Sequence, residues 1–135
     1  MTTVSIPRTL INQILEQAQH SPDREVCGLI ASRHGQGLHC YPIDNADPHP
    51  DHHFLMDPKQ QIDAMRDMRE RGEELFAIYH SHPDAPPLPS QEDLEQAAYP
   101  DALYIIISLA TEGTLQMQGF SLRDGAMTAV DFIIE

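Results

Sequence analysis

The sequence predicts a mixed α/β (α+β) fold in which helices flank a central mixed β-sheet. Apolar residues repeat at helical spacing in two segments, within residues 10–18 and 62–68. Apolar runs of strand length lie between and after these segments, and the run at 103–109 has the character of a strand covered on both faces. Turn-forming glycine, proline and aspartate residues separate the segments.

The chain begins with a short lead-in, residues 1–7, that has the character of an edge strand. Pro7 suits the first turn of a helix, because its missing N–H is not needed there. The predicted helix has one apolar face, formed by Leu10, Ile11, Ile14, Leu15 and Ala18. Ser21-Pro22-Asp23 ends it.

A β-hairpin and a long loop are predicted next. Glu25 to Ser32 and Leu38 to Ile43 are the predicted strands, joined by a turn at His34-Gly35-Gln36-Gly37. A polar loop runs from Asp44 to Asp57. It contains three histidines that we expect to be exposed, because no fixed spacing connects them to another motif: His49, His52 and His53.

The second predicted helix begins at Asp57-Pro58, an N-cap followed by a first-turn proline. It runs to about Arg71, and Gly72 ends it. Its predicted buried side chains are Ile62, Met65 and Met68.

The remaining elements are a central strand, a short helix and three further strands. The apolar run Leu75–Tyr79 predicts the central strand, and the short helix extends from Gln91 to about Ala98. The strand at 103–109 follows. Turn signals at Thr111-Glu112-Gly113 and Asp124-Gly125 delimit the last two strands.

Length and charge limit what the chain can be. Its 135 residues predict a single domain over residues 1–135. Eight lysines and arginines against 21 aspartates and glutamates give a net charge of −13, which weighs against nucleic acid or a membrane surface as a partner. Two cysteines do not make a disulfide framework, and neither a signal peptide nor a membrane-length apolar run is evident, so we expect a cytoplasmic protein. The sequence predicts no oligomeric state.

One stretch has the residue types of a metal site. His80 and His82 follow the central strand run, and side chains two apart on a strand point to the same face. After a proline-rich loop, Ser90 has the position of a helix N-cap and Asp93 lies three residues further on. Two imidazoles and a carboxylate suit a catalytic zinc, which takes three protein ligands and keeps a fourth position for water. Without a metal, the same residues are a capped helix start beside two hydrogen-bonded histidines.

The spacing His-x-His, seven residues, Ser-x-x-Asp resembles the signature of the JAMM (MPN-plus, or JAB) metalloproteases, filled here by His80, His82, Ser90 and Asp93. Glu25, in Glu25-Val26-Cys27-Gly28-Leu29-Ile30, matches the family's upstream glutamate. The resemblance covers most of the chain and implies an MPN/JAB-like fold, layered as in cytidine deaminases. It is similar above all to short bacterial members that act on ubiquitin-like sulfur-carrier proteins.

The resemblance implies a zinc metallopeptidase with zinc as its cofactor, held by His80, His82 and Asp93. Glu25 would move the proton of the attacking water, and Ser90 would donate a hydrogen bond to the developing oxyanion. The implied substrate is a peptide or isopeptide bond after the C-terminal Gly-Gly of a ubiquitin-like sulfur-carrier protein. The sequence leaves open which bond is cut and whether the loop at 44–57 gates the site.

Other functions fit the sequence less well. A non-catalytic MPN-type scaffold that only binds a protein would generally lack the ligand set found here. A zinc hydrolase of a small-molecule amide, of the deaminase type, needs His-x-Glu and Pro-Cys-x-x-Cys, and neither occurs in the sequence. A DNA-linked role conflicts with the charge of −13. Cys27 is a poor candidate for a nucleophile, because it lies inside a predicted strand.

Overall fold

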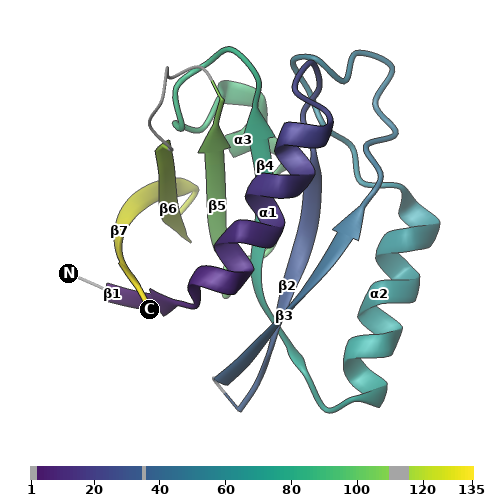
Figure 1. The fold of residues 1–135 in the computed structure, drawn as a ribbon, viewed down its shortest axis with the longest axis vertical. Coiled ribbons are helices and arrows are strands. Elements are labelled where there is room, and N and C mark those ends of the chain that lie inside the picture. Colours follow the sequence, from purple (N-terminus) through teal and green to yellow (C-terminus); the bar gives the residue numbers. More distant parts are fainter. Residues whose placement is uncertain (1–2, 35, 110–115) are drawn as a thin grey trace.

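The computed structural model describes residues 3–34, 36–109 and 116–135 and has a mixed sheet at its centre (Figure 1). Its strands lie in the order β1-β7-β6-β5-β4-β2-β3. The elements are β1 (Thr3–Ile6), α1 (Arg8–His20), β2 (Cys27–Arg33), β3 (Gln36–Ile43), α2 (Pro58–Glu70), β4 (Glu74–His82), α3 (Gln91–Gln96), β5 (Leu103–Ser108), β6 (Gln116–Arg123) and β7 (Ala126–Ile134). The β1–β7 and β4–β5 pairs are parallel, and the other neighbouring strands pair antiparallel. The predicted mixed sheet flanked by helices is confirmed.

Different helices cover the two faces of the sheet. α1 buries Leu10, Ile11 and Ile14 against one face. On the other face, α2 buries Ala64 and Met68. Both layers are needed because the central strands are apolar on both sides: every residue of β5 is buried, as the sequence predicted.

The prediction for the buried side of α2 was wrong at one position. Ile62 is 64% exposed, whereas Ala64 and Met68 face the core and Met65 packs partly against it. A helix turns by about 100° per residue, so Ile62 lies roughly opposite Ala64 on the helix surface. The apolar stripe is therefore narrower than the sequence pattern suggested.

Several element boundaries also differ from the prediction: β3, for example, begins at Gln36, inside the predicted turn, and not at Leu38. β2 begins at Cys27 rather than at Glu25, because the backbone of Glu25 bonds to the loop at 44–57 and not to a neighbouring strand. α3 ends at Gln96, and Ala97 is already extended. The predicted edge strand, the first helix and the β2–β3 hairpin are confirmed.

Two predicted turns use left-handed backbone. Asp124 and Gly125 have φ values of 51° and 76° and join β6 to β7 as a two-residue hairpin loop. Gly72 ends α2 with φ of 70°. Gly35, in the predicted turn of the first hairpin, and the predicted turn at 111–113 lie outside the described residues. Among the described helices, none has the length and apolar character needed to cross a membrane.

Candidate metal centre

The end of β4 presents two imidazoles on one face of the sheet. His80 and His82 are both buried, and their Nε2 atoms lie 3.1 Å apart. Ser81, between them, points to the opposite face, where its Oγ accepts the N–H of Val26 at 2.9 Å. The same strand therefore delivers the two histidines and anchors the segment that follows Glu25.

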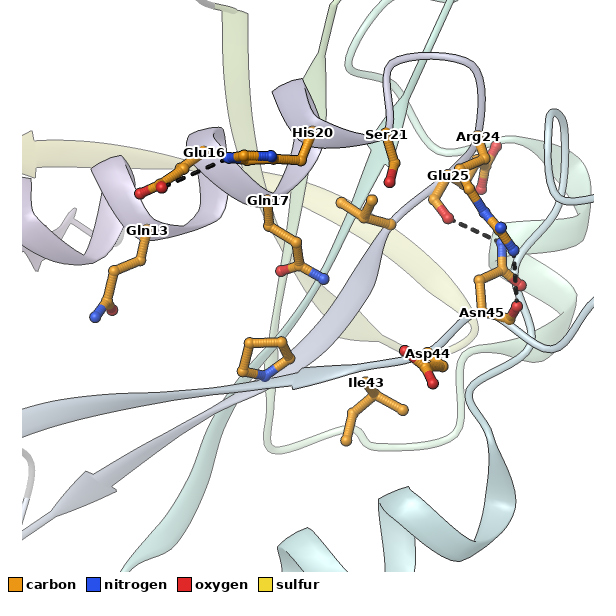
Figure 2. Close-up of a pocket in the computed structure, with 12 residues that line it drawn as sticks. Gln13, Glu16, Gln17, His20, Ser21, Arg24, Glu25, Ile43, Asp44 and Asn45 are labelled. Carbon is orange, nitrogen blue, oxygen red and sulfur yellow. Dashed lines mark hydrogen bonds and ion pairs between the residues drawn. The ribbon is translucent and has the colours of Figure 1, made fainter.

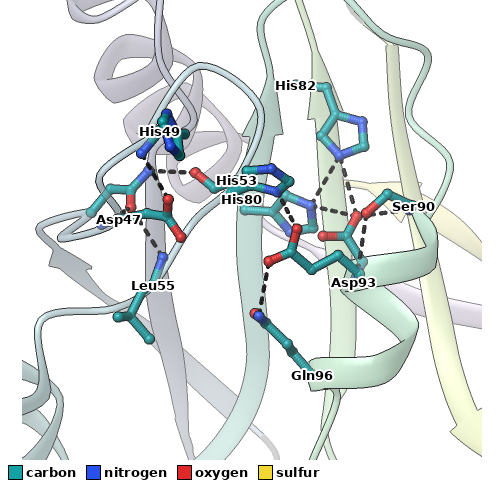
Figure 3. A network of polar contacts seen from close by, with 11 residues as sticks. Asp47, His49, His53, Leu55, His80, His82, Ser90, Asp93 and Gln96 are labelled. Carbon is teal, nitrogen blue, oxygen red and sulfur yellow. Dashed lines mark hydrogen bonds and ion pairs between the residues drawn. The ribbon is translucent and has the colours of Figure 1, made fainter.

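The start of α3 presents the carboxylate of Asp93 to these imidazoles. Ser90 caps the helix: its Oγ accepts the Asp93 N–H at 3.0 Å, and its own N–H donates to Asp93 Oδ2 at 2.9 Å. Asp93 Oδ2 lies 3.2 Å from His80 Nε2 and 3.3 Å from His82 Nε2 (Figure 3). The capping box thus fixes the orientation of the carboxylate, so the capping interpretation and the metal interpretation of Ser90 and Asp93 are compatible.

The three donor atoms form a nearly equilateral triangle with sides of 3.1 to 3.3 Å. Zinc binds histidine nitrogen and carboxylate oxygen at roughly 2.0–2.2 Å with tetrahedral geometry, which puts neighbouring ligand atoms about 3.3 Å apart. The donor types and their spacing therefore fit three corners of a zinc site.

Contacts behind the histidines orient their rings. The Nδ1 of His82 lies 2.8 Å from the carbonyl oxygen of Pro86, so Nδ1 donates a proton to it and Nε2 is the ring nitrogen that faces the cluster. The ring of Phe54 stacks on that of His80, with centroids 4.4 Å apart. Metal-binding histidines are commonly held by a hydrogen bond from the ring nitrogen that does not face the metal, as His82 is held by Pro86.

The protonation of two of the three residues, His80 and Asp93, suits a cation, whereas that of His82 favours the protonated ring when no metal is bound. Burial lowers the pKa of His80, which favours the neutral imidazole. Burial raises the pKa of Asp93, but hydrogen bonds from both histidines outweigh burial and leave that pKa well below its usual value. For His82, burial lowers the pKa and the bonds to Asp93 and Pro86 raise it, with a net rise. An anionic carboxylate and a neutral imidazole are the forms that bind metal.

Glu25 lies beside this triangle, two residues before the start of β2. It is only 4% exposed, so the expectation for an ordinary surface glutamate does not hold. Its Oε1 is buried without a hydrogen-bond partner in the described part of the chain, and the ligand atoms of Glu25, His80, His82 and Asp93 all lie within 4.8 Å of one another. Burial raises the pKa of Glu25 to about 8, with an opposing contribution from His82. A buried, unpaired carboxylate oxygen beside a donor triangle is where a water at the metal would find a proton acceptor.

The loop at 44–57 contributes no ligand atom to this cluster. His49 and His52 are exposed, as predicted. His53 is partly buried and contacts the carboxylate of Glu92, in the first turn of α3 (Figure 3). Cys27 is fully buried, and burial raises the pKa of its thiol to about 12, which agrees with the prediction that it is not a nucleophile.

Two cavities adjoin the cluster. A polar cleft of about 750 Å³ lies between α1 and the end of β3, and Glu25 and Asn45 are part of its wall (Figure 2). A smaller apolar cavity of about 130 Å³ is lined by His80 and Asp93 together with Phe54 and other residues. The loop at 44–57 therefore borders both the cleft at Glu25 and the cavity at His80 and Asp93.

Sequence reasoning missed three residues that shape the site: Asn45, Phe54 and Ser81. Ser81 was detectable, since the residue between two same-face histidines on a strand must face the other way. Asn45 and Phe54 act across long stretches of sequence, and no local pattern marks them.

Fold and site together define an α+β protein with a candidate three-ligand metal centre and an adjacent buried glutamate. The chain belongs to the family of prokaryotic homologs of the JAB domain, whose model (Prok-JAB) matches residues 7–120. The predicted membership of the short prokaryotic JAMM/JAB type is confirmed.

Several relatives of this chain are named as a peptidase or a protease. The chain is 30% identical over 121 residues to the CysO-cysteine peptidase of Mycobacterium tuberculosis. The aligned region covers 88% of this chain and 82% of that protein. It is 31% identical over 125 residues to the probable TtuB-protein conjugate cleaving protease of Thermus thermophilus, covering 93% and 80%. A desampylase of Haloferax volcanii is 29% identical over 102 residues, covering 74% and 73%.

The fold has a solved counterpart. The solution structure of protein DSY2949 from Desulfitobacterium hafniense matches with a TM-score of 0.83 and 31% identity, covering all of this chain and 93% of that one.

Proposed function

We propose that this protein is a zinc-dependent metallopeptidase that hydrolyses a peptide or isopeptide bond after the C-terminal Gly-Gly of a ubiquitin-like sulfur-carrier protein. The main support is the convergence of His80 Nε2, His82 Nε2 and Asp93 Oδ2 at 3.1 to 3.3 Å from one another. The unpaired Oε1 of Glu25 beside them adds the group that hydrolysis needs.

His80, His82 and Asp93 would hold the zinc ion. When bound, the ion supplies a Lewis acid for the scissile carbonyl and a water of lowered pKa. The bond from the Nδ1 of His82 to the Pro86 carbonyl keeps the ring turned so that its Nε2 faces the cluster, and the capping box keeps the carboxylate of Asp93 in place.

Glu25 accepts the proton of the attacking water at its free Oε1 and returns that proton to the leaving amine. A group that must both accept and return a proton works best with a pKa near the working pH. Burial raises the pKa of Glu25 to about 8 in the metal-free protein, and the charge of a bound ion would lower it from there. No covalent intermediate on the protein is required.

Ser90 stabilises the oxyanion. Its Oγ accepts the N–H of Asp93, so the proton of its own hydroxyl can be donated to a substrate oxygen. A hydrogen bond directed at developing negative charge is usually a large term in acyl-transfer catalysis.

The substrate class rests on the named relatives, which include a CysO-cysteine peptidase and a probable TtuB-protein conjugate cleaving protease. A Gly-Gly tail suits the approach, because the loop after His82 is stiffened by prolines and residues without β-carbons pass a constriction most easily. The prolines are Pro83, Pro86, Pro87 and Pro89. An extended tail held by backbone hydrogen bonds to a sheet edge would present the carbonyl of the second glycine to the cluster.

The test is mass spectrometry of a sulfur-carrier protein that bears a cysteine or a short peptide after its Gly-Gly, incubated with zinc-supplied enzyme. We expect a product ending at the second glycine, and Glu25→Gln to keep the fold and the zinc while losing about 100- to 10,000-fold in turnover. Equal turnover by Glu25→Gln and wild type would refute the role of Glu25.

A matched substrate tests the tail. Replacing the second glycine by alanine should slow cleavage strongly. If the alanine version is cut as fast, or if unrelated unfolded peptides are cut equally well, the protein is a general peptidase.

A further inference from the structure

The side chain of Asn45, at the start of the loop at 44–57, uses its full hydrogen-bonding capacity on the backbone. Its Nδ2 donates to the carbonyl oxygens of Glu25 and His53, both at 2.9 Å. Its Oδ1 accepts the N–H groups of Asp47 and Leu55, both at 3.0 Å. Because two partners can only accept and two can only donate, the orientation of the amide is fixed.

The backbone of Glu25 is held by this loop on both sides. Its N–H donates to the carbonyl of Pro50 at 2.6 Å, and its carbonyl accepts from Asn45 (Figure 2). Beyond Glu25, the chain is attached to β4 through the bond between Val26 N–H and Ser81 Oγ. Glu25 therefore lies between an anchor on the metal-ligand strand and an anchor on the loop.

The same amide also fixes the loop against a metal ligand. Asn45 bonds to His53 and Leu55, the two neighbours of Phe54, and Phe54 stacks on the ring of His80. The geometry makes this part of the loop a fixed wall of the site, built around one side chain.

We propose that Asn45 is a positioning residue that holds the carboxylate of Glu25 at the distance from the cluster that proton transfer requires. This inference rests on the proposed function of Glu25. Without the two N–H donors of Asn45, the carbonyls of Glu25 and His53 lose their partners, and the backbone of Glu25 keeps only its N–H bond to Pro50 as a direct attachment to the loop. A displacement of about 1 Å in a reacting group can cost about 100-fold in rate.

Asn45→Asp isolates the effect. A carboxylate still accepts the N–H groups of Asp47 and Leu55 but cannot donate to Glu25 and His53. The matched control is Asp57→Ala, which removes the cap of α2 at the other end of the same loop without touching Glu25. Asn45→Ala provides a second variant if the aspartate variant does not fold.

The first readout needs no turnover. Hydrogen exchange of the Glu25 amide, measured by NMR, should be clearly faster in Asn45→Asp than in wild type and unchanged in Asp57→Ala. Unchanged exchange in both Asn45 variants would overturn the proposal.

The second readout is kinetic, on the sulfur-carrier fusion with zinc-supplied protein. We expect Asn45→Asp to lower kcat by about 10- to 100-fold with zinc content and KM close to wild type. In a Glu25→Gln background, the same change should lower the residual rate by less than about twofold, because Asn45 acts through Glu25.

The outcomes separate the two proposals. If wild type does not cleave the fusion, or Glu25→Gln is fully active, the proposed function is wrong. If Glu25→Gln is impaired while Asn45→Asp and Asn45→Ala turn over at the wild-type rate, only the role of Asn45 is wrong. If Asn45→Asp lowers kcat by the same factor in the Glu25→Gln background as in wild type, Asn45 does not act through Glu25. Asn45 is then a general structural residue, and the inference is overturned.

Discussion

Two loops border the candidate metal centre, and they contribute to it in different ways. The loop from 83 to 89 connects His82 to Ser90 and Asp93, and through the start of α3 it delivers a donor atom to the cluster. The loop at 44–57 carries three histidines, the residue type most often found on metals, yet none of them belongs to the cluster found among the described residues.

The difference shows what brings a side chain into the donor triangle. Asp93 is placed by a helix cap, so its spacing from the histidines of β4 is fixed by a short, stiff stretch of chain. The loop at 44–57 is placed by backbone hydrogen bonds to Asn45. It acts as a wall, and its histidines can point outward or contact Glu92 without affecting the donor triangle.

The largest expected difference is between two single variants, one in each region. One removes the carboxylate of Asp93, and the other removes the ring of His53 in the loop at 44–57. Asp93→Ala should lower turnover by about 1,000-fold or more, because the cluster loses a donor and the metal its Lewis-acid role. His53→Ala, which removes the contact to Glu92, should stay within about fivefold of wild type. The measurement is kcat/KM on the sulfur-carrier fusion, and similar losses in both variants would remove the distinction between the loops.

A smaller effect is expected at Ser90, which caps α3 and, in the proposed mechanism, also donates to the oxyanion. Ser90→Ala should lower kcat by about 100-fold through the lost oxyanion donor, and should also cost about 1 kcal/mol of stability through the lost cap. Glycine at an N-cap costs only a few tenths of a kcal/mol, so Ser90→Gly should lose the rate and keep most of the stability. Steady-state kinetics and urea unfolding check both, and a rate that follows stability across the two variants would refute a role in catalysis.

The smallest expected effect is a pH dependence of stability in the metal-free protein. Burial raises the pKa of Glu25 from 4.5 to about 8, so between these values the folded state binds more protons than the unfolded state. The free energy of unfolding therefore falls as the pH rises through this window. Glutamine has no proton to lose, so Glu25→Gln should be more stable than wild type by about 1 kcal/mol or more at pH 8.

At pH 4 this advantage should disappear, because Glu25 is protonated in most folded and unfolded chains. Urea unfolding at both pH values gives the comparison, with Glu16→Gln, on the exposed surface of α1, as the control. A Glu25→Gln advantage that is equal at pH 4 and pH 8 would contradict the pKa argument.

The sequence predicted the sheet, the helices and the grouping of His80, His82 and Asp93, because each depends on local rules. Period-two alternation places two histidines on one face, and a helix cap places Asp93. Ile62 was assigned wrongly because the sequence pattern does not show which stripe of a helix meets its sheet. The burial of Glu25 and the contacts of Asn45 depend on a loop that returns to β2 from about 20 residues away, and spacing along the chain does not encode that.

The most direct test of the metal centre is the zinc content of purified protein after metal removal and resupply. We predict one zinc per chain in wild type and in Glu25→Gln, and little zinc in His82→Ala, whose lost ring supplies one corner of the donor triangle. Loss of zinc in Glu25→Gln would make Glu25 a ligand instead of a proton acceptor. Wild-type protein that takes up no zinc with His80, His82 and Asp93 intact would contradict the account.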